Sequence, residues 1–337
     1  MKKLLLLLGL SLLLLATLIA CDKGHSQDTD TTIPVTDVAT ETETTAEEIT
    51  TPEEETTVKP EEITTEEITT EEETTATPIA GMDSGIVRDG TPKKYITLSF
   101  DDGITQDARM IEIMKKYNVY CCTFNINTGL FGANWTWVGP AQFNNPNLSH
   151  LRFTRAELET GIYDGFDIAC HTATHPSLKN LTERQVTREI RTDETNITEI
   201  FGFKPVGMAW PGGDTEFNDD NIVTILNTTD IRYARCTTRT GNFKLPEYFM
   251  RWQPTCSFFD VDCLSLTKEF IKAECTEDML LYIWDHSYAL DGYNAWSKFE
   301  LLIKTISEAA AKDDQIVLVT NSQFYQLFKD EIPAWKE

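Results

Sequence analysis

Basic residues and histidines are scarce in this sequence of 337 residues. It contains 29 lysines and arginines against 54 aspartates and glutamates, so its formal net charge is −25, and it has only five histidines. This balance argues against a nucleic-acid-binding protein, because contacts to phosphates need a basic patch. None of the eight cysteines forms a Cys-x-x-Cys pair, which argues against a zinc ribbon or a thioredoxin-type motif.

The acidic residues are most concentrated before residue 81. Residues 22–80 hold 18 aspartates and glutamates, two lysines and no aromatic residue, and the repeat Glu-Glu-Ile/Glu-Thr-Thr runs over 61–75. High charge and low hydrophobicity predict a disordered spacer, with an acidic partner-binding segment as the alternative. We therefore expect a disordered Thr/Glu-rich linker over 21–80 and one globular domain over 81–337.

The start of the chain resembles a bacterial lipoprotein signal. Lys2 and Lys3 precede an apolar run over 4–19, and Cys21 follows Leu-Ile-Ala. A basic start and a short apolar run that ends in a small residue are typical of a secretory signal peptide, and a cysteine in this setting resembles the lipobox, where it is acylated. The run is short for a transmembrane helix, which is the alternative. We expect a signal peptide over 1–20, a lipid anchor at Cys21, and export to the cell surface or the periplasmic face of a bacterial membrane.

Residues 81–337 alternate between short apolar runs and amphipathic segments, which predicts a parallel sheet with helices between its strands. The expected strands are 95–100, 121–126, 166–170, 206–210, 231–234, 279–284 and 316–320. The expected helices are 106–116, a long helix that begins at a capping box of Thr182 and Gln185, 218–226, 260–274 and 296–312. Thr154 and Glu157 form a second expected capping box. In an open sheet or a barrel of this kind, functional residues gather at the carboxyl ends of the strands.

Two adjacent aspartates follow the first predicted strand. Asp101 and Asp102 precede Gly103, and neighbouring carboxylates repel each other unless a divalent cation offsets their charge. His171 and His175 follow the third predicted strand, and their spacing puts both rings on one face of a helical turn, where they can share a metal ion. These side chains are therefore candidates for one metal site.

Two further motifs follow predicted strands. Trp210-Pro211-Gly212-Gly213 comes after the fourth strand, and its glycines leave backbone N–H groups free to face a ligand. His286 comes after the sixth strand, whereas His25 lies in the acidic segment and His150 in a loop. Each motif alone is ordinary, but their order and their common place after strands point to one functional site.

In this order the motifs resemble those of the polysaccharide deacetylases, which are carbohydrate esterase family 4 with the NodB-homology domain. The matching segments are 99–103, 171–176, 210–213 and 283–287, and the resemblance spans about residues 90–325. It implies a distorted (β/α) barrel of about seven parallel strands. It also implies a metal-dependent hydrolase that removes acetyl groups from a carbohydrate.

The resemblance implies a role for each motif residue. Three of them would bind a divalent metal ion, with zinc as the expected one and water at the open positions: Asp102, His171 and His175. Asp101 would be the general base that takes a proton from the metal-bound water, and His286 the general acid that protonates the leaving amine. The N–H of Gly212 would stabilise the oxyanion together with the metal. These residue types suit amide hydrolysis, which needs an activated water, an electrophile and a proton for a poor leaving group.

Two positions depart from the family pattern. Where the family has an arginine that contacts the base aspartate, this sequence has Ala209. Arg251, which stands where the family has an aspartate, is the first candidate to replace that arginine at Asp101, and Arg235 is the second. The alternative is that Arg251 only pairs with surface carboxylates. Three carboxylates are candidates to tune the acid histidine, and the sequence leaves the choice open: Asp260, Asp262 and Asp285.

Aromatic residues near the motifs are candidates to line a carbohydrate groove, because flat rings stack on sugar faces. The candidates for substrate binding are Trp210, Pro211, Trp252, Trp284 and Tyr288. Trp135 and Trp137 in the loop over 127–150 are further candidates, whereas Cys170 is expected in the core.

The sequence thus predicts a monomeric exported lipoprotein that removes N-acetyl groups from a GlcNAc-containing polysaccharide. O-acetyl groups of a xylan-type polymer are the alternative substrate. A non-catalytic carbohydrate-binding lipoprotein on the same fold is the alternative function, supported by Ala209 and opposed by Asp101 and His286. A structural metal site is a third alternative, but such a site normally closes with a fourth protein ligand, which the sequence does not offer.

Overall fold

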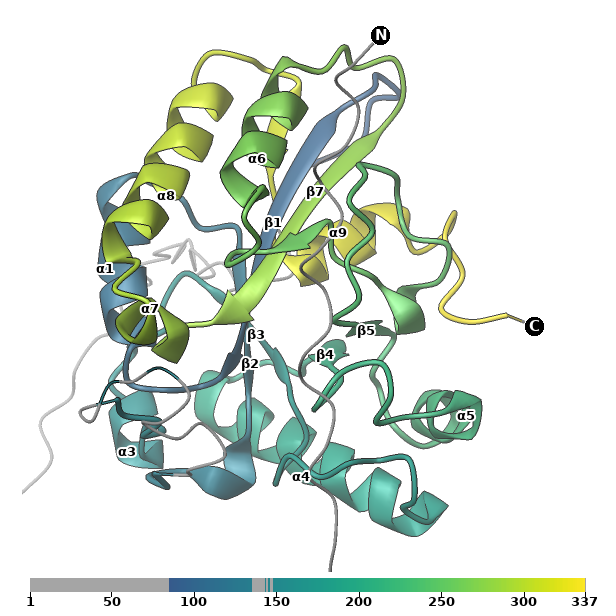
Figure 1. Ribbon diagram of the computed structural model, residues 1–337. Coiled ribbons are helices and arrows are strands. Elements are labelled where there is room, and N and C mark those ends of the chain that lie inside the picture. The colour runs from purple at the N-terminus through teal and green to yellow at the C-terminus, as the bar shows by residue number, and fades with distance from the viewer. Residues whose placement is uncertain (1–84, 135–142, 144, 146–147, 337) are drawn as a thin grey trace, which may run out of the picture. The chain divides into compact units, whose positions relative to one another are not determined.

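A computed structural model describes residues 85–134, 143, 145 and 148–336 (Figure 1). The predicted signal peptide, the lipidation site Cys21 and the Thr/Glu-rich linker lie outside these residues, as do Trp135 and Trp137. Within the described ranges, no helix is both long enough and apolar enough to span a lipid bilayer.

The described part of the chain contains one sheet of eight parallel strands. Seven of them follow the order β5-β4-β3-β2-β1-β7-β6, and β8 pairs with β1. The strands are β1 (Lys94–Asp102), β2 (Cys122–Ile126), β3 (Asp167–Cys170), β4 (Gly207–Ala209), β5 (Tyr233–Arg235), β6 (Cys256–Ser257), β7 (Met279–His286) and β8 (Ile316–Leu318). The sheet curls into an open, distorted barrel, which confirms the predicted fold class.

Helices connect the strands, as expected for a parallel sheet. They are α1 (Asp107–Lys116), α3 (Arg155–Leu158), α4 (Glu183–Phe201), α5 (Asp219–Thr228), α6 (Cys263–Lys272), α7 (Tyr288–Gly292), α8 (Trp296–Ala310) and α9 (Asn321–Phe328), with 3-10 turns η1 (Thr128–Leu130) and η2 (Phe249–Arg251). Both predicted capping boxes are present, at the starts of α3 and α4. All predicted strands and helices are found, with ends shifted by a few residues, whereas β6, α7 and α9 were not predicted.

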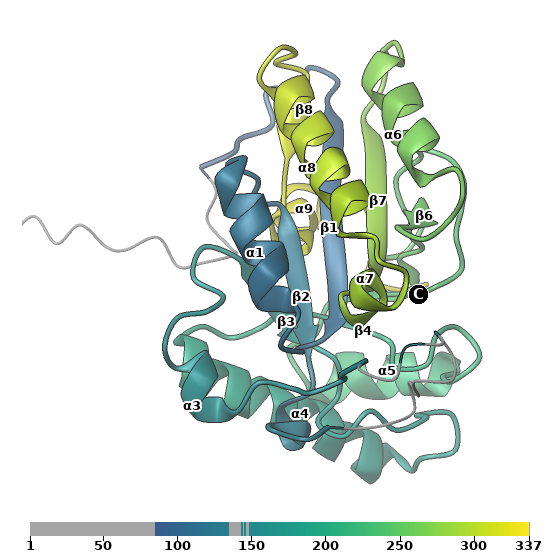
Figure 2. The same cartoon turned by 60° about the vertical axis from the view of Figure 1, so that its left-hand side comes forward.

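The outer face of β1 is apolar. Ile96, Leu98 and Phe100 are buried in the main hydrophobic core, and the ring of Phe100 meets Phe299 of α8 edge to face, with the ring centroids 5.9 Å apart. Helices α1, α8 and α6 lie along this side of the strands (Figure 2). The period of two in a strand leaves the alternate residues for the opposite face.

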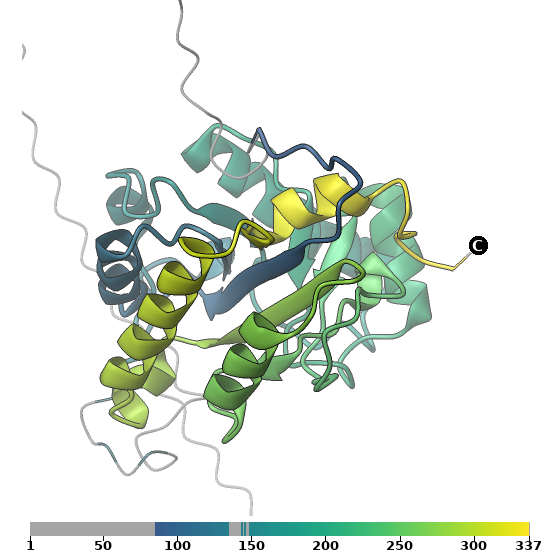
Figure 3. The same ribbon diagram turned by 90° about the horizontal axis from the view of Figure 1, so that it is seen from above.

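The inner face of β1 is polar. Thr97 donates a hydrogen bond to Asn321 at the start of α9 (2.8 Å), and Ser99 accepts one from Asn125 of β2 (2.8 Å). Helix α9 lies across β1 from α8 (Figure 3). Asp101 continues this polar face to the carboxyl end of the strand.

One short segment links β5, an outer strand of the sheet, with β7 near the opposite end of the strand order. The N–H of Trp252 donates to Ala234 of β5, and the N–H of Cys236 donates to Trp252. Three residues further on, the N–H of Thr255 donates to Tyr282 of β7. Because β5 stands at one end of the strand order and β7 beside the other, this segment closes the sheet towards a barrel.

Candidate active site

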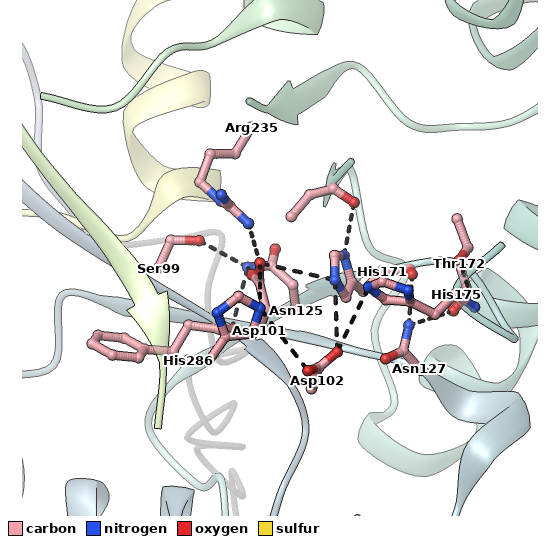
Figure 4. A network of polar contacts seen from close by, with 12 residues as sticks. Ser99, Asp101, Asp102, Asn125, Asn127, His171, Thr172, His175, Arg235 and His286 are labelled. Atoms are coloured by element: carbon pink, nitrogen blue, oxygen red, sulfur yellow. Dashed lines mark hydrogen bonds and ion pairs between the residues drawn. The ribbon is translucent and has the colours of Figure 1, made fainter. Parts of the chain in front are cut away.

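Asp101 and Asp102 lie at the carboxyl end of β1 and both face one site (Figure 4). Consecutive side chains of a regular strand point to opposite faces, but Asp102 has a φ of 84°, in the left-handed region. This turn directs its carboxylate to the same side as Asp101. Gly103 follows with a φ of 65°, and a Cβ there would lie 2.9 Å from the side chain of Ile126, so this position needs glycine.

Both carboxylate oxygens of Asp101 are held. Asn125 Nδ2 donates to Oδ1 (2.9 Å), and the guanidinium of Arg235 contacts Oδ2. Burial alone would raise the pKa of Asp101, but the charges of Arg235 and His286 outweigh it and hold the pKa below its ordinary value. Asp101 is therefore ionised at neutral pH, in the form that accepts a proton.

His171 and His175 follow β3 in a turn that is not helical. Thr172 and His175 have φ values of 63° and 56°, so the predicted helical turn is wrong. Two left-handed residues, rather than helical spacing, bring the rings together, with their centroids 4.8 Å apart. Asn127 supports this turn, because its Nδ2 donates to the carbonyl oxygens of His171 (2.6 Å) and Thr172 (2.9 Å).

The three predicted metal ligands form one cluster. One side-chain atom each of Asp102, His171 and His175 lies within 4.8 Å of the others. Oδ1 of Asp102 is 3.8 Å from Nε2 of His171 and 3.9 Å from Nε2 of His175. Nδ1 of His171 lies 2.9 Å from the carbonyl oxygen of Ala209, and its buried Nε2 has no hydrogen-bond partner among the described residues.

This cluster fits a divalent metal ion such as zinc. The orphaned Nε2 of His171 is the lone pair that a metal would take up. Burial lowers the pKa of His175 to about 4 and also lowers that of His171, so both rings are neutral, the form that binds metals. Burial would raise the pKa of Asp102, but its hydrogen bond with His150 and nearby positive charges hold the pKa well below the ordinary value. Three protein ligands leave positions open, as in catalytic rather than structural zinc sites.

His286 lies on the other side of the two aspartates, at the end of β7. Its Nε2 is 3.9 Å from Oδ2 of Asp101 and 4.0 Å from Oδ2 of Asp102. Burial would lower the pKa of His286, but the neighbouring carboxylates of Asp285, Asp102 and Asp101 favour the charged ring and raise the pKa to about 9. The ring is therefore protonated at neutral pH and can donate a proton.

Asp285 is the carboxylate that faces His286. Its Oδ1 lies 3.7 Å from Nδ1 of His286, and Ser257 and the N–H of Phe259 donate to its Oδ2. The other two candidates from the sequence, Asp260 and Asp262, pair instead with Arg239 at 3.1 and 2.8 Å. The structure thus resolves the choice that the sequence left open.

The arginine beside Asp101 is Arg235, not Arg251. Arg235 is fully buried at the end of β5, and its guanidinium lies over the ring of Trp284, 4.2 Å from the centroid. Arg251, the first candidate from the sequence, lies in η2 and pairs with Asp219 at 2.8 Å, where the two side chains are 38 % and 50 % exposed. The prediction that Arg251 reaches Asp101 is therefore corrected, because η2 turns this side chain outwards.

Two of the predicted sugar-binding aromatics belong to the core. Trp210 is 1 % exposed, stacks on Phe217 with ring centroids 3.9 Å apart, and donates through Nε1 to the carbonyl oxygen of Met250 (3.0 Å). Trp252 is fully buried and packs against Tyr233 and other rings of the second hydrophobic cluster. Neither ring has a free face for a sugar, so these two predictions are corrected.

Of the remaining candidates, Tyr288 and Trp284 lie beside His286. The rings of Tyr288 and Trp284 have centroids 5.0 and 5.7 Å from that of His286. Gly212 is exposed at the turn after β4, with a φ of 71°, and Pro211 beside it is buried. Pro211 therefore shapes this turn rather than offering a surface to a ligand.

Three residues at the site were not predicted. Asn125 lies opposite Asp101 in the register of β1 and β2, so its place at a strand end beside the aspartates was a signal in the sequence. His150 and Arg152 come from the segment that follows the long loop, and both contact Asp102, at 2.8 and 3.3 Å. No motif marks these two, because the loop returns to the site only in the folded chain.

Residues 88–234 match the model of the polysaccharide deacetylase family. This segment contains Asp101, Asp102, His171 and His175, but ends just before Arg235. No curated protein sequence matches the chain.

Several solved structures are similar to the chain at low identity. Deacetylase PplD of Streptococcus pyogenes in complex with acetate is 19 % identical, with a TM-score of 0.34, covering 42 % of this chain and 56 % of PplD. A family 4 carbohydrate esterase of Streptomyces lividans in complex with acetate is 13 % identical, with a TM-score of 0.41, covering 67 % and 92 %. BA3943 of Bacillus anthracis, a CE4 family pseudoenzyme, is 15 % identical, with a TM-score of 0.41, covering 68 % and 64 %. The chain thus spans between about half and two thirds of the length of PplD and BA3943, and a likeness of this degree supports no assignment of activity.

Proposed function

We propose that this chain is a metal-dependent hydrolase that removes N-acetyl groups from a GlcNAc-containing polysaccharide. One observation carries the proposal. An ionised aspartate, Asp101, and a protonated histidine, His286, flank the three candidate metal ligands at the ends of β1 and β7. A base, an acid and an electrophile in one place are what the hydrolysis of an amide requires. The match of residues 88–234 to the polysaccharide deacetylase family supports the class of substrate.

Asp102, His171 and His175 would hold the metal ion, with zinc as the expected one. When bound, a divalent ion would supply a Lewis acid that polarises the acetyl carbonyl. Two neutral imidazoles and one carboxylate form a donor set that zinc commonly accepts.

Asp101 acts as the general base. It accepts a proton from the water that attacks the acetyl carbon, and the carboxylate is held in place by Asn125 on Oδ1 and by Arg235 on Oδ2. Because both partners are donors to the carboxylate, they stabilise its ionised form and fix its direction.

His286 acts as the general acid. It carries its transferable proton on Nε2, the nitrogen nearer to the two aspartates, and gives that proton to the leaving amine nitrogen. Asp285 faces Nδ1 and keeps the ring charged and oriented. An amide nitrogen is a poor leaving group without such a proton, and the backbone N–H of Gly212 is the proposed donor to the oxyanion.

The alternative of a non-catalytic binding protein loses its main support. It rested on Ala209, where the family has an arginine beside the base aspartate. Arg235 reaches Asp101 from β5 instead. An O-acetyl esterase of the xylan type remains the alternative substrate assignment, because an ester uses the same base and metal.

Acetate release tests this proposal. The full chain, loaded with zinc, is incubated with N-acetylglucosamine oligomers and with acetylated xylan, and Asp101→Asn and a chelator serve as controls. Release from the oligomers that stops with the chelator and in the variant is expected. Release from xylan alone would favour the esterase, and no release from either polymer by zinc-loaded protein would contradict the proposed activity.

We further propose that the chain is exported and anchored by a lipid on Cys21, with residues 22–80 as a spacer between the membrane and the domain. Labelling with a radioactive fatty acid in a bacterial host should mark the chain. Cys21→Ser should lose the label, and a label retained by this variant would contradict the anchor.

A further inference from the structure

The segment that follows the long loop is fixed against the residues after Asp102. Residues 104 and 152 form an antiparallel bridge, the N–H of Thr105 donates to Leu151 (2.9 Å), and the N–H of Phe153 donates to Gly103 (3.2 Å). Three backbone contacts within a few residues hold this segment in one register. The side chains at 150 and 152 are thereby placed beside the metal cluster.

His150 forms a hydrogen bond with one carboxylate oxygen of Asp102. Its Nε2 lies 2.8 Å from Oδ2, and both side chains are almost fully buried. A carboxylate can only accept, so Nε2 of His150 is the donor. The ring of Tyr288 meets the ring of His150 edge to face, with centroids 4.9 Å apart. This contact limits the rotation of the His150 ring.

Arg152 connects Asp102 with the turn that carries the two histidines. Its guanidinium lies 3.3 Å from Oδ1 of Asp102 and 3.1 Å from Oδ1 of Asn127. Asn127 in turn donates to the carbonyl oxygens of His171 and Thr172. One buried cation thus links the aspartate of the cluster to the backbone of the histidine turn.

We propose that His150 and Arg152 are positioning residues of the metal site, which make Asp102 a ligand through Oδ1 alone. His150 holds Oδ2, so that Oδ1 is the oxygen turned towards the Nε2 atoms of His171 and His175. Arg152 fixes the position of this oxygen relative to the turn that carries His171 and His175. The inference rests on the metal-binding part of the proposed function, but it does not depend on which acetylated substrate is cleaved.

The chemistry of the contacts favours this role over a purely structural one. Burying an ion pair costs desolvation energy, and an apolar pair of similar volume would stabilise the fold as well or better. Partners that orient metal ligands, in contrast, commonly change metal affinity by 10- to 100-fold when they are removed. Metal affinity therefore separates the two roles.

The test measures zinc binding by the metal-free full chain, by competition with a chromophoric chelator. His150→Ala is expected to weaken zinc binding by about 10- to 100-fold. His150→Gln, whose amide can donate to Oδ2, is expected to recover most of that affinity. Arg155→Gln, which removes an exposed arginine paired with Glu159 in the same stretch of chain, is the matched control and should bind zinc as the parent does.

Cobalt absorption spectra and thermal unfolding complete the test. Cobalt bound to His150→Ala should show an altered visible spectrum, because the carboxylate would be free to bind through both oxygens. Thermal unfolding of the metal-free proteins shows whether each variant is folded. If His150→Ala is not folded, Arg152→Lys takes its place in the same measurements. Zinc affinity and cobalt spectrum equal to those of the parent in a folded His150→Ala would overturn the inference, even if acetate release is normal. A parent that binds zinc but releases no acetate would contradict the proposed function and leave the positioning role standing.

Discussion

Arg235 at the end of β5 contacts Asp101 at the end of β1, although β4, β3 and β2 lie between these two strands in the sheet. The contact requires a sheet that curls until its outer strand faces its centre. The guanidinium is fully buried between the carboxylate and the ring of Trp284 on β7. Its position explains how the chain supplies a cation to Asp101 while residue 209 is alanine.

Removing this arginine should change the pH dependence of catalysis. An arginine beside an aspartate lowers the carboxyl pKa by about one to three units, so in Arg235→Ala the pKa of Asp101 rises. Asp101 is then protonated, and inactive as a base, up to a higher pH. The acidic limb of the kcat/KM profile for acetate release should therefore move to higher pH by about that amount. Arg235→Lys keeps the charge and should move the limb less.

Arg251→Ala is the matched control for this measurement, because its exposed pair with Asp219 lies away from the site. Its pH profile should equal that of the parent. A limb that stays in place in folded Arg235→Ala, or that moves in Arg251→Ala, would contradict the assignment of Arg235.

The raised pKa of His286 should be measurable by NMR titration of the metal-free protein. Its pKa is raised to about 9, with burial opposing and Asp285, Asp102 and Asp101 favouring the charged ring. A histidine signal titrating near pH 9 is therefore expected in NMR spectra, and Asp285→Asn should move that titration to lower pH. The assignment fails if no histidine titrates above the ordinary value of about 6.5, or if Asp285→Asn leaves the signal unmoved.

Zinc should stabilise the fold through the three-residue cluster. A ligand present at 100 times its dissociation constant contributes about 2.7 kcal/mol to the free energy of unfolding. Thermal unfolding should shift upwards when zinc is added to the metal-free chain, and His175→Ala should abolish the shift. Lys179→Gln, an exposed change a few residues away, should keep it. An equal shift in His175→Ala would place the zinc elsewhere.

Asp107 should make stability depend on pH. This side chain at the start of α1 is fully buried, and burial raises its pKa to about 7 despite hydrogen bonds from Ser287 and Tyr163. The folded state therefore binds the proton more tightly than the unfolded state, whose carboxyl titrates near 3.8. The contribution of Asp107 to stability is present below about pH 4 and is lost as the pH rises towards about 7.

Urea unfolding at several pH values tests this sign. Asp107→Asn cannot ionise, so the difference in unfolding free energy between variant and parent should shift in favour of the variant between pH 4 and pH 8. A difference that is constant over this range would show that Asp107 does not titrate as inferred. Comparing variant with parent cancels the other titrating groups.

The sequence predicted the sheet and the main site residues because these depend on short-range patterns. Alternating and β-branched runs predicted the strands, and Thr182 with Gln185 predicted the start of α4. In a parallel sheet the carboxyl ends of strands meet at one edge, so motifs that each follow a strand were bound to converge. Asp101, Asp102 and His286 could be grouped on this ground alone.

The tertiary structure decided the conformation of the backbone turns at the site and the path by which the loop before His150 leads back to it. Left-handed φ values at Asp102 and His175, which are not glycines, cannot be read from residue type, so the helical turn predicted for the histidines was wrong. Burial likewise decided that Trp252 belongs to the core, since an aromatic residue suits a core and a groove equally well. Arg235 reaches Asp101 across 134 positions of sequence and His150 reaches Asp102 across 48. Such contacts depend on the curl of the sheet and the path of one loop, and these result from packing of the whole domain rather than from any local pattern.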